Sequence, residues 1–303
     1  MKQKITWLLF HEPAELFIRT AEHFEQEVNR LSNDQFEFEI LELSDYEARY
    51  HNGKACDPVE ELRAGRVHMS QCHTSLLAYA NATNILALGL PFIFRDHDHA
   101  TRVFEGQIGE ELLDHVKQTM GIQGLSFTYS GGYKVMASNS PVTSVDDFAH
   151  LKFKQDRMAL TQDMFAALGA TAVADGTHDF RDTTLPRFGA DAREDQRWAT
   201  QTGHAMYLTT ILMNDAMWEE FDEQTQLWFK QAARECAKTE RAQSVADGEF
   251  IASNREKQQE LGIDQVLSLP ETEIDRLKAL LAPVTEKWRA YFPNNLVDRI
   301  EAA

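Results

Sequence analysis

The chain has 303 residues, of which 43% are hydrophobic, and this length fits two domains of ordinary size. Its 48 acidic and 30 basic side chains leave a formal net charge of −18. A surface this acidic repels phosphate backbones, so the composition argues against nucleic-acid binding. No apolar run reaches the roughly 18 residues that a membrane-spanning helix requires.

The first residues are similar to an export signal, with Met1–Lys4 followed by the apolar run Ile5–Phe10. The run is short and no small-residue cleavage site follows it, so we expect it to form the first strand of a mature domain. Cys56, Cys72 and Cys236 have no C-x-x-C spacing and allow at most one disulfide. They do not decide the redox compartment.

Strand and helix patterns alternate in the N-terminal part of the chain. The order β-α-β-α-β predicts a parallel sheet with helices on both faces. The expected elements are a strand at 5–10, a helix at 14–31, a strand at 36–43, an irregular stretch at 45–56, a short helix at 57–64 and a strand at 67–71.

The remaining elements follow from the same periodicities and from their stop signals. Gly131-Gly132 indicates a flexible joint between two strands, and we expect a domain crossover at 128–132. Thr143 or Ser144 is expected to cap a one-turn helix at 146–148, and Gly169 to end a helix in the left-handed conformation. The other predictions are a helix at 100–120, strands at 124–129, 133–139 and 151–154, a helix at 158–168, a strand at 205–213, a long helix at 222–261 with a weak point at Gly248, a strand at 266–269 and a helix at 271–291.

This order predicts an α/β protein whose chain leaves one lobe, builds a second and returns. Lobe I is expected to comprise residues 1–128 with about 206–250, and lobe II residues 129–205 with about 251–303. The long late helix is long enough to lie across both lobes. Several crossings between two lobes favour hinge closure around a ligand.

Motifs of catalysis are missing from the sequence. No glycine-rich phosphate loop and no G-x-S-x-G element occurs. His97-Asp98-His99 lacks a third ligand at zinc-site spacing, so we expect a solvated loop, no metal and no cofactor. His73, His178 and His204 occur singly and are expected to be structural or to donate hydrogen bonds.

Four cationic residues are the main candidates for ligand binding. Lys134 and Lys154 lie on predicted strands of the second lobe, and Lys154 ends its strand. Ligands of open α/β sheets bind at such carboxyl ends. Arg181 and Arg193 follow in polar loops, and arginine binds carboxylates in a bidentate manner. The alternatives remain open: a solvated strand edge for the lysines, and surface loops for the arginines.

Six motifs occur in a characteristic order along nearly the whole chain. They are L-P-F-I-F at 90–94, S-P-V-T-S-V-D-D-F-A-H-L-K-F-K at 140–154, D-M-F-A-A-L-G-A-T at 163–171, G-A-D-A-R-E-D at 189–195, T-G-H-A at 202–205 and N-D-A-M-W at 214–218. Their order and spacing resemble the solute-binding proteins of tripartite ATP-independent periplasmic (TRAP) transporters, DctP type. The resemblance implies a two-lobed periplasmic binding protein fold (type II-like), with a ligand cleft between the lobes and a long helix spanning both. It also implies a non-catalytic receptor for a small organic acid.

The sequence departs from this family at the residues that commonly bind the ligand. The arginine of the family's K-I-R motif, which usually clamps a carboxylate, corresponds to Lys154, and that of G-F-R corresponds to Lys134. The asparagine of Q-E-N corresponds to Asp195, and the E-V-Y segment reads Asp179-Phe180-Arg181. Lysine lacks the planar fork of arginine, so the usual clamp is altered.

Two interpretations of the ligand follow from these departures. In the first, Lys154 binds an anion, a carboxylate or a sulfonate, together with Lys134, Arg181 or Arg193. In the second, Lys154 pairs with Asp195 and the ligand is zwitterionic or neutral. We expect an anionic or zwitterionic organic acid.

The resemblance also suggests the surroundings of the ligand and the partners of the protein. The remaining candidate side chains are aromatic walls and hydrogen-bonding groups, namely Phe92, Tyr133, Trp198, His73 and Glu15. The expected partner is a TRAP membrane permease, and we expect a periplasmic monomer. The rival hypothesis is a two-lobed enzyme that uses Lys154 and Asp195 as an acid–base pair.

Overall fold

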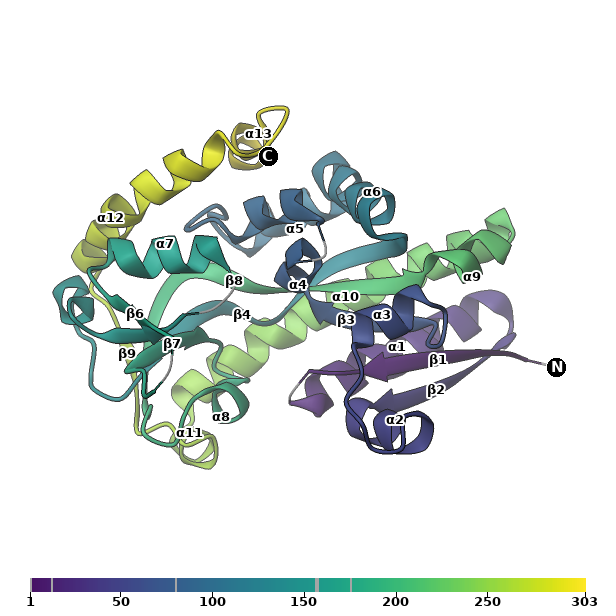
Figure 1. Cartoon of the computed structure of the whole chain (residues 1–303), viewed down its shortest axis with the longest axis horizontal. Coiled ribbons are helices and arrows are strands. Elements are labelled where there is room, and N and C mark those ends of the chain that lie inside the picture. Colours follow the sequence, from purple (N-terminus) through teal and green to yellow (C-terminus); the bar gives the residue numbers. More distant parts are fainter. Residues whose placement is uncertain (1, 12, 80, 156–157, 175) are drawn as a thin grey trace. The chain divides into compact units, whose positions relative to one another are not determined.

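A computed structural model describes residues 2–11, 13–79, 81–155, 158–174 and 176–303 (Figure 1). The chain divides into two units. Unit 1 comprises Met1–Ile85, Thr101–Tyr129 and Leu208–Ala242, and unit 2 comprises Leu86–Ala100, Ser130–Tyr207 and Gln243–Ala303. This division differs from the sequence-based boundaries at two places. Residues 86–100 belong to unit 2, and the late helix changes unit after Ala242 rather than near residue 250.

Unit 1 is built on the parallel arrangement that the sequence predicts. Strand β1 (Gln3–Leu9) pairs in parallel with β2 (Phe36–Glu42) and with β3 (Met69–His73). Alternation along β1 turns its apolar side chains into a core with helix α1 (Ala14–Ser32). The antiparallel neighbour of β3 is the C-terminal part of β8 (Trp198–Asn214).

Short helices complete unit 1, and two of them differ from the prediction. The stretch expected to be irregular begins with helix α2 (Leu43–Tyr50). The helix expected at 100–120 is divided into α5 (His97–Glu105) and α6 (Gln107–Met120) at Gly106, where a Cβ would lie 2.6 Å from the Arg102 carbonyl oxygen. The other elements in and next to this unit are α3 (Pro58–Arg63), α4 (Thr74–Tyr79), η1 (Thr83–Gly89) and α9 (Asp215–Glu220).

The sheet of unit 2 includes the short strand β5 (Lys152–Lys154), which lies next to the edge strand β6 (Thr171–Val173). Strand β5 pairs in parallel with β6 and β7 (Phe180–Thr183), and β7 pairs antiparallel with β4 (Ile122–Ser138). Strand β9 (Gln265–Ser268) pairs in parallel with the start of β8.

The glycine pair in β4 does not separate two strands, as the sequence suggested. Gly131 and Gly132 have φ values of 83° and 72° and lie within one continuous strand. A Cβ at Gly131 would lie 2.2 Å from Thr184 Oγ1. The glycines therefore allow a left-handed backbone and a close approach to the neighbouring segment.

The predicted helices of the second half of the chain are present apart from one break, and two short helices, α8 (Phe188–Asp191) and α13 (Leu296–Ala302), were not predicted. The long helix ends at Ser253, and Asn254, whose side chain accepts a hydrogen bond from Lys257 N, caps a separate helix. Gly248 lies inside the long helix and does not break it. The elements are η2 (Val145–Phe148), α7 (Ala159–Ala167), α8 (Phe188–Asp191), α10 (Glu223–Ser253), α11 (Arg255–Glu260), α12 (Glu271–Arg289) and α13 (Leu296–Ala302). Among the helices of the described residues, none has the length and apolar character that a membrane crossing requires.

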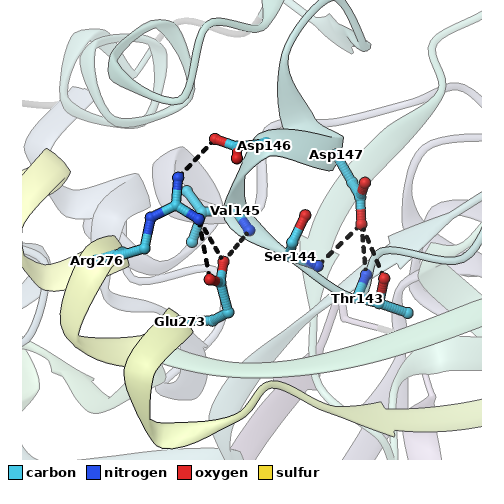
Figure 2. A network of polar contacts seen from close by, with 7 residues as sticks. All are labelled: Thr143, Ser144, Val145, Asp146, Asp147, Glu273 and Arg276. Atoms are coloured by element: carbon cyan, nitrogen blue, oxygen red, sulfur yellow. Dashed lines mark hydrogen bonds and ion pairs between the residues drawn. The ribbon is translucent and has the colours of Figure 1, made fainter.

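A polar network joins η2 to α12 (Figure 2). Asp147 Oδ2 accepts from Thr143 N and Ser144 N, both at 2.8 Å, which completes the capping box at Ser144. Glu273 accepts from Val145 N at 2.7 Å, and Arg276 bridges Glu273 and Asp146. This network confirms Ser144 as the cap and fixes the chain just before β5.

Unit 1 contains a buried carboxyl group on α10. Glu240 is 5% exposed, and Gln71 Nε2 lies 2.8 and 2.9 Å from its two oxygens. Burial raises the pKa of Glu240 to about 7, although the hydrogen bond from Gln71 acts in the opposite direction.

We predict that Glu240 makes unit 1 less stable as the pH rises. Its pKa is about 4.5 when exposed and about 7 in the folded protein, so the unfolding free energy falls between these values by up to about 3 kcal/mol. Glu240→Gln removes this loss, because the amide does not ionise. Urea unfolding at pH 5 and pH 8 measures the effect. Equal pH slopes in the parent and the variant contradict it, and Glu235→Gln, an exposed position of the same helix, is the control.

Candidate functional site

The register of two neighbouring strands in unit 2 brings Lys154 and Arg181 together. Phe153 of β5 faces Phe180 of β7, and both phenylalanines are buried and pack against Phe165 of α7. Successive side chains of a strand point to opposite faces. Lys154 and Arg181, the next residues of the two strands, therefore turn away from this aromatic core, side by side.

The buried imidazole of His178 lies in the field of these cations. Burial lowers the pKa of His178, and Arg193, Arg181 and Lys154 lower it further, whereas Asp195 raises it. Three cations and one carboxylate thus act on the pKa of one ring. We call these five residues the cationic cluster: Lys154, His178, Arg181, Arg193 and Asp195.

Local hydrogen bonds position the arginine of β7. Arg181 Nη1 donates to the Asp191 carbonyl oxygen at the end of α8, at 2.5 Å. Its Nε atom is buried and has no hydrogen-bond partner among the described residues. A buried donor without an acceptor costs about 1–3 kcal/mol.

Asp195 pairs with Arg193 and not with Lys154. Arg193 Nε donates to Asp195 Oδ1 at 2.9 Å, and the side chains are 37% and 48% exposed. This hydrogen bond lowers the pKa of Asp195. Lys154 forms no hydrogen bond or ion pair with a described residue, and its side chain is exposed. The pairing of Lys154 with Asp195, one of the two interpretations from the sequence, is therefore absent from the described part of the chain.

Lys134 has a different environment. Its Nζ atom lies 2.6 Å from Asp182 Oδ2, and the two side chains are only 14% and 16% exposed. Nε2 of the buried His204 lies 3.7 Å from the same oxygen. Burial favours the protonated acid, but Lys134 and His204 outweigh it and hold the pKa of Asp182 well below its usual range. Asp182 thus neutralises the charge of Lys134.

The predicted aromatic residues Phe92, Tyr133 and Trp198 lie on separate segments of unit 2. Tyr133 donates to the Phe94 carbonyl oxygen at 3.3 Å and lines a cavity of about 490 Å³ together with Lys134. Phe92 has a φ of 56°, and its N–H donates to the His204 carbonyl oxygen at 2.7 Å. Trp198 begins β8 and pairs with Gln265 of β9. Their roles as ligand contacts remain predictions.

The two predicted hydrogen-bonding residues belong to unit 1. Glu15 is exposed in the first turn of α1. His73 ends β3, where its N–H donates to His11 Nε2 at 3.0 Å and its Nδ1 lies 2.5 Å from Ser75 Oγ. Their roles, too, remain predictions.

Strand register places Lys154 next to Arg181, and a hydrogen bond joins Arg193 to Asp195. All four charges influence the pKa of His178, and their roles as ligand contacts remain predictions. His178 was interpreted as an isolated histidine. Its position just before the strand that carries Arg181 is the signal that would have identified it.

Comparisons with known proteins agree on one family. A family model described as "Bacterial extracellular solute-binding protein, family 7" (DctP) matches residues 10–174 and 189–290. The chain is 26% identical over 217 residues to the C4-dicarboxylate-binding periplasmic protein DctP of Rhodobacter capsulatus. This alignment covers 66% of the present chain and 61% of the relative. The chain thus spans about three fifths of the length of the first curated relatives it matches.

Solved structures show the same fold. A TRAP periplasmic solute-binding protein of Bradyrhizobium sp., in complex with galacturonate, has a TM-score of 0.83 at 20% identity, with 99% of this chain and 100% of that chain covered. Another, from Sulfurospirillum deleyianum with bound succinate, has a TM-score of 0.81 at 21% identity, with 100% and 99% covered.

We predict that the pKa of His178 reports the charges of the cationic cluster. Lys154→Gln raises this pKa because it removes a cation, and Asp195→Asn lowers it because it removes the opposing carboxylate. An NMR titration of the imidazole measures both shifts. Lys152→Gln, on the same strand, should leave the pKa unchanged. Shifts of the same sign in both cluster variants would show that His178 does not lie in this field.

We also predict that Lys134 stabilises the fold by its pairing with Asp182. Lys134→Met leaves a nearly buried carboxylate without its ammonium partner and lowers the unfolding free energy at pH 7 by about 3 kcal/mol. The double variant Lys134→Met/Asp182→Asn should recover much of this loss. Urea denaturation tests both, and a single variant as stable as the parent would rule out the structural role.

Proposed function

Because the chain belongs to the DctP family of bacterial extracellular solute-binding proteins, we propose that it is the solute receptor of a TRAP transporter. Its ligand is a small organic acid, and its partner is the membrane permease of that transporter. It acts in the periplasm as a monomer. The cationic cluster of unit 2 is the observation that carries the choice of ligand.

The charge of this cluster supports an anionic ligand. The protein as a whole carries a net charge of −18. Within the cluster, three cations accompany a single carboxylate, which is already paired with Arg193. A local excess of positive charge in so acidic a chain favours a carboxylate or another small anion. A cationic ligand would meet repulsion at the same place.

The geometry supports a carboxylate held by Lys154 and Arg181. Lys154 is exposed beside Arg181, whose buried Nε has no acceptor among the described residues. A ligand carboxylate would interact with the exposed ammonium of Lys154, and the positive charge of Arg181 beside it would add to the attraction. Charge-assisted hydrogen bonds of this type contribute about 1.5–3 kcal/mol each.

Related proteins are consistent with this class of ligand. One relative is named as a C4-dicarboxylate-binding protein, and two related structures contain succinate and galacturonate. All of these ligands are organic acids. Proteins of this family are solute-binding proteins and not enzymes, and the pairing of Asp195 with Arg193 removes the Lys154–Asp195 acid–base pair on which the rival hypothesis depended. We therefore propose no catalytic activity.

We predict that a small organic acid raises the melting temperature of the protein and is recovered unchanged. At a concentration of 100 times Kd, a ligand that binds only the folded state adds about 2.7 kcal/mol of stability. A thermal-shift screen of dicarboxylates, uronates, hydroxy acids and sulfonates, with matching neutral sugars and amines, tests the class. Stabilisation by the neutral or cationic compounds alone would contradict an anionic ligand, and turnover of the ligand would contradict a receptor.

The anchor is tested with a matched pair of lysines. Lys154→Gln should weaken binding of the identified acid about 10- to 100-fold, because it removes a charge-assisted contact. Lys152→Gln, an exposed lysine two residues earlier on β5, should bind like the parent. Equal affinities of the two variants, measured by titration calorimetry, would exclude Lys154 as the anchor.

A further inference from the structure

Three side chains with metal-binding chemistry meet in unit 1, apart from the cationic cluster. They are His51, Cys56 and Glu61, and their ligating atoms all lie within 4.8 Å of one another. His51 and Cys56 are half-buried and Glu61 is buried. We propose that these residues form a binding site for a divalent metal ion of the zinc type, a function beyond solute binding and independent of it.

The distances fit a metal site before any metal is bound. His51 Nε2 lies 3.4 Å from Glu61 Oε2. Zn–N bonds of about 2.0–2.1 Å and Zn–O bonds of about 2.0–2.2 Å place two such atoms about 3.4 Å apart in a tetrahedral site. The thiolate sulfur needs a separation of about 3.6 Å from each of them. The imidazole and the carboxylate are therefore already spaced as ligands, and Cys56 needs only a small adjustment.

The chemistry of the three groups selects the metal. A thiolate, an imidazole and a carboxylate together are typical of zinc, whereas Ca²⁺ and Mg²⁺ prefer oxygen ligands alone. Three protein ligands leave a fourth tetrahedral position, which water can fill.

Two helices hold the loop that carries these ligands. His51 directly follows α2, and its N–H donates to the Glu47 carbonyl oxygen at 2.9 Å. The N–H of Cys56 donates to the Glu47 carboxylate at 2.9 Å. Asp57 then caps α3, which carries Glu61. The backbone on both sides of the site is thus fixed by bonds that do not involve a metal.

The present partners of Glu61 determine what a metal must replace. Tyr46 donates to Glu61 Oε2 at 2.7 Å, and Arg66 donates to both carboxylate oxygens at 2.7 and 2.9 Å. The Arg66 side chain is 55% exposed, so water can solvate its guanidinium when it leaves, whereas the buried carboxylate then needs the metal as its counter-ion. Tyr46 is buried and would remain to orient Glu61 behind the metal. Arg66 therefore competes with the metal for the Glu61 carboxylate, whereas Tyr46 orients this carboxylate for metal binding.

Titration calorimetry of the reduced, metal-free full chain with Zn²⁺ tests the proposal. We expect one ion per chain, and Cys56→Ser and His51→Gln should each weaken binding by at least about tenfold, the lower limit for loss of even an outer-shell partner. Binding of Co²⁺ should give the absorption of a thiolate-to-cobalt charge transfer, which Cys56→Ser abolishes. Cys72 and Cys236 are 0% and 1% exposed and do not contribute to this signal.

A second histidine–carboxylate pair provides the control. His23 Nε2 lies 3.8 Å from Glu27 on α1, and among the described residues this pair belongs to no group of three potential metal ligands. His23→Gln should therefore retain the zinc affinity of the parent. Any of three results overturns the proposal. The parent does not bind zinc, or both Cys56→Ser and His51→Gln bind zinc as tightly as the parent, or only His23→Gln loses binding. Equal unfolding curves of the variants in EDTA show that they are folded.

Arg66→Gln provides a test with the opposite sign. The variant removes the competitor for Glu61, so we expect the zinc affinity to rise and the stabilisation by saturating zinc to exceed that of the parent. A lower affinity in this variant would show that Arg66 orders the site rather than competing for it, and would overturn the role assigned to it here.

Discussion

The packing of Phe153 against Phe180 is the interaction on which the candidate site depends. The two phenylalanines face each other between β5 and β7 and join an aromatic core with Phe148 and Phe165. Burial of such rings fixes the register of the two short strands, because a shift by one residue would turn both rings to the wrong face. The same register places Lys154 beside Arg181. A hydrophobic contact thereby determines the position of two charges.

The cations of unit 2 have separate roles because their partners differ. Asp182 neutralises Lys134 in a nearly buried ion pair. Lys154 is exposed and forms no hydrogen bond or ion pair with a described residue. The buried Nε of Arg181 has no hydrogen-bond acceptor among the described residues. Neutralising one lysine and leaving the other exposed concentrates positive charge at the cluster around His178. The rest of the chain is strongly acidic, with a net charge of −18, and therefore repels a small anion. The positive charges of the cluster stand out against this background.

Most of the elements could be predicted from local signals, and two of the errors concern glycines. The caps at Ser144 and Gly169 and the parallel strands β1, β2 and β3 follow from residue types and periodicity. The glycines at 131–132 and 248 were interpreted as interruptions, yet the first pair lies inside β4 and the last inside α10. Glycine only permits a change of direction. Whether the chain uses it depends on neighbours such as Thr184, which are remote in sequence.

The amino-acid sequence alone determined the family and the α/β class, because these depend on residue types in order. Only the tertiary structure decided which charges meet. The sequence allowed Asp195 to pair with Lys154, and it allowed Lys134 to bind the ligand together with Lys154. In the structure, Asp195 pairs with Arg193 and Lys134 pairs with Asp182. The proposed metal-binding trio arose in the same way, since His51 and Cys56 come from the stretch predicted to be irregular and Glu61 from the short helix that follows it. An ion pair requires a separation of a few ångströms between side chains, and that separation is set by strand register and helix packing rather than by sequence order.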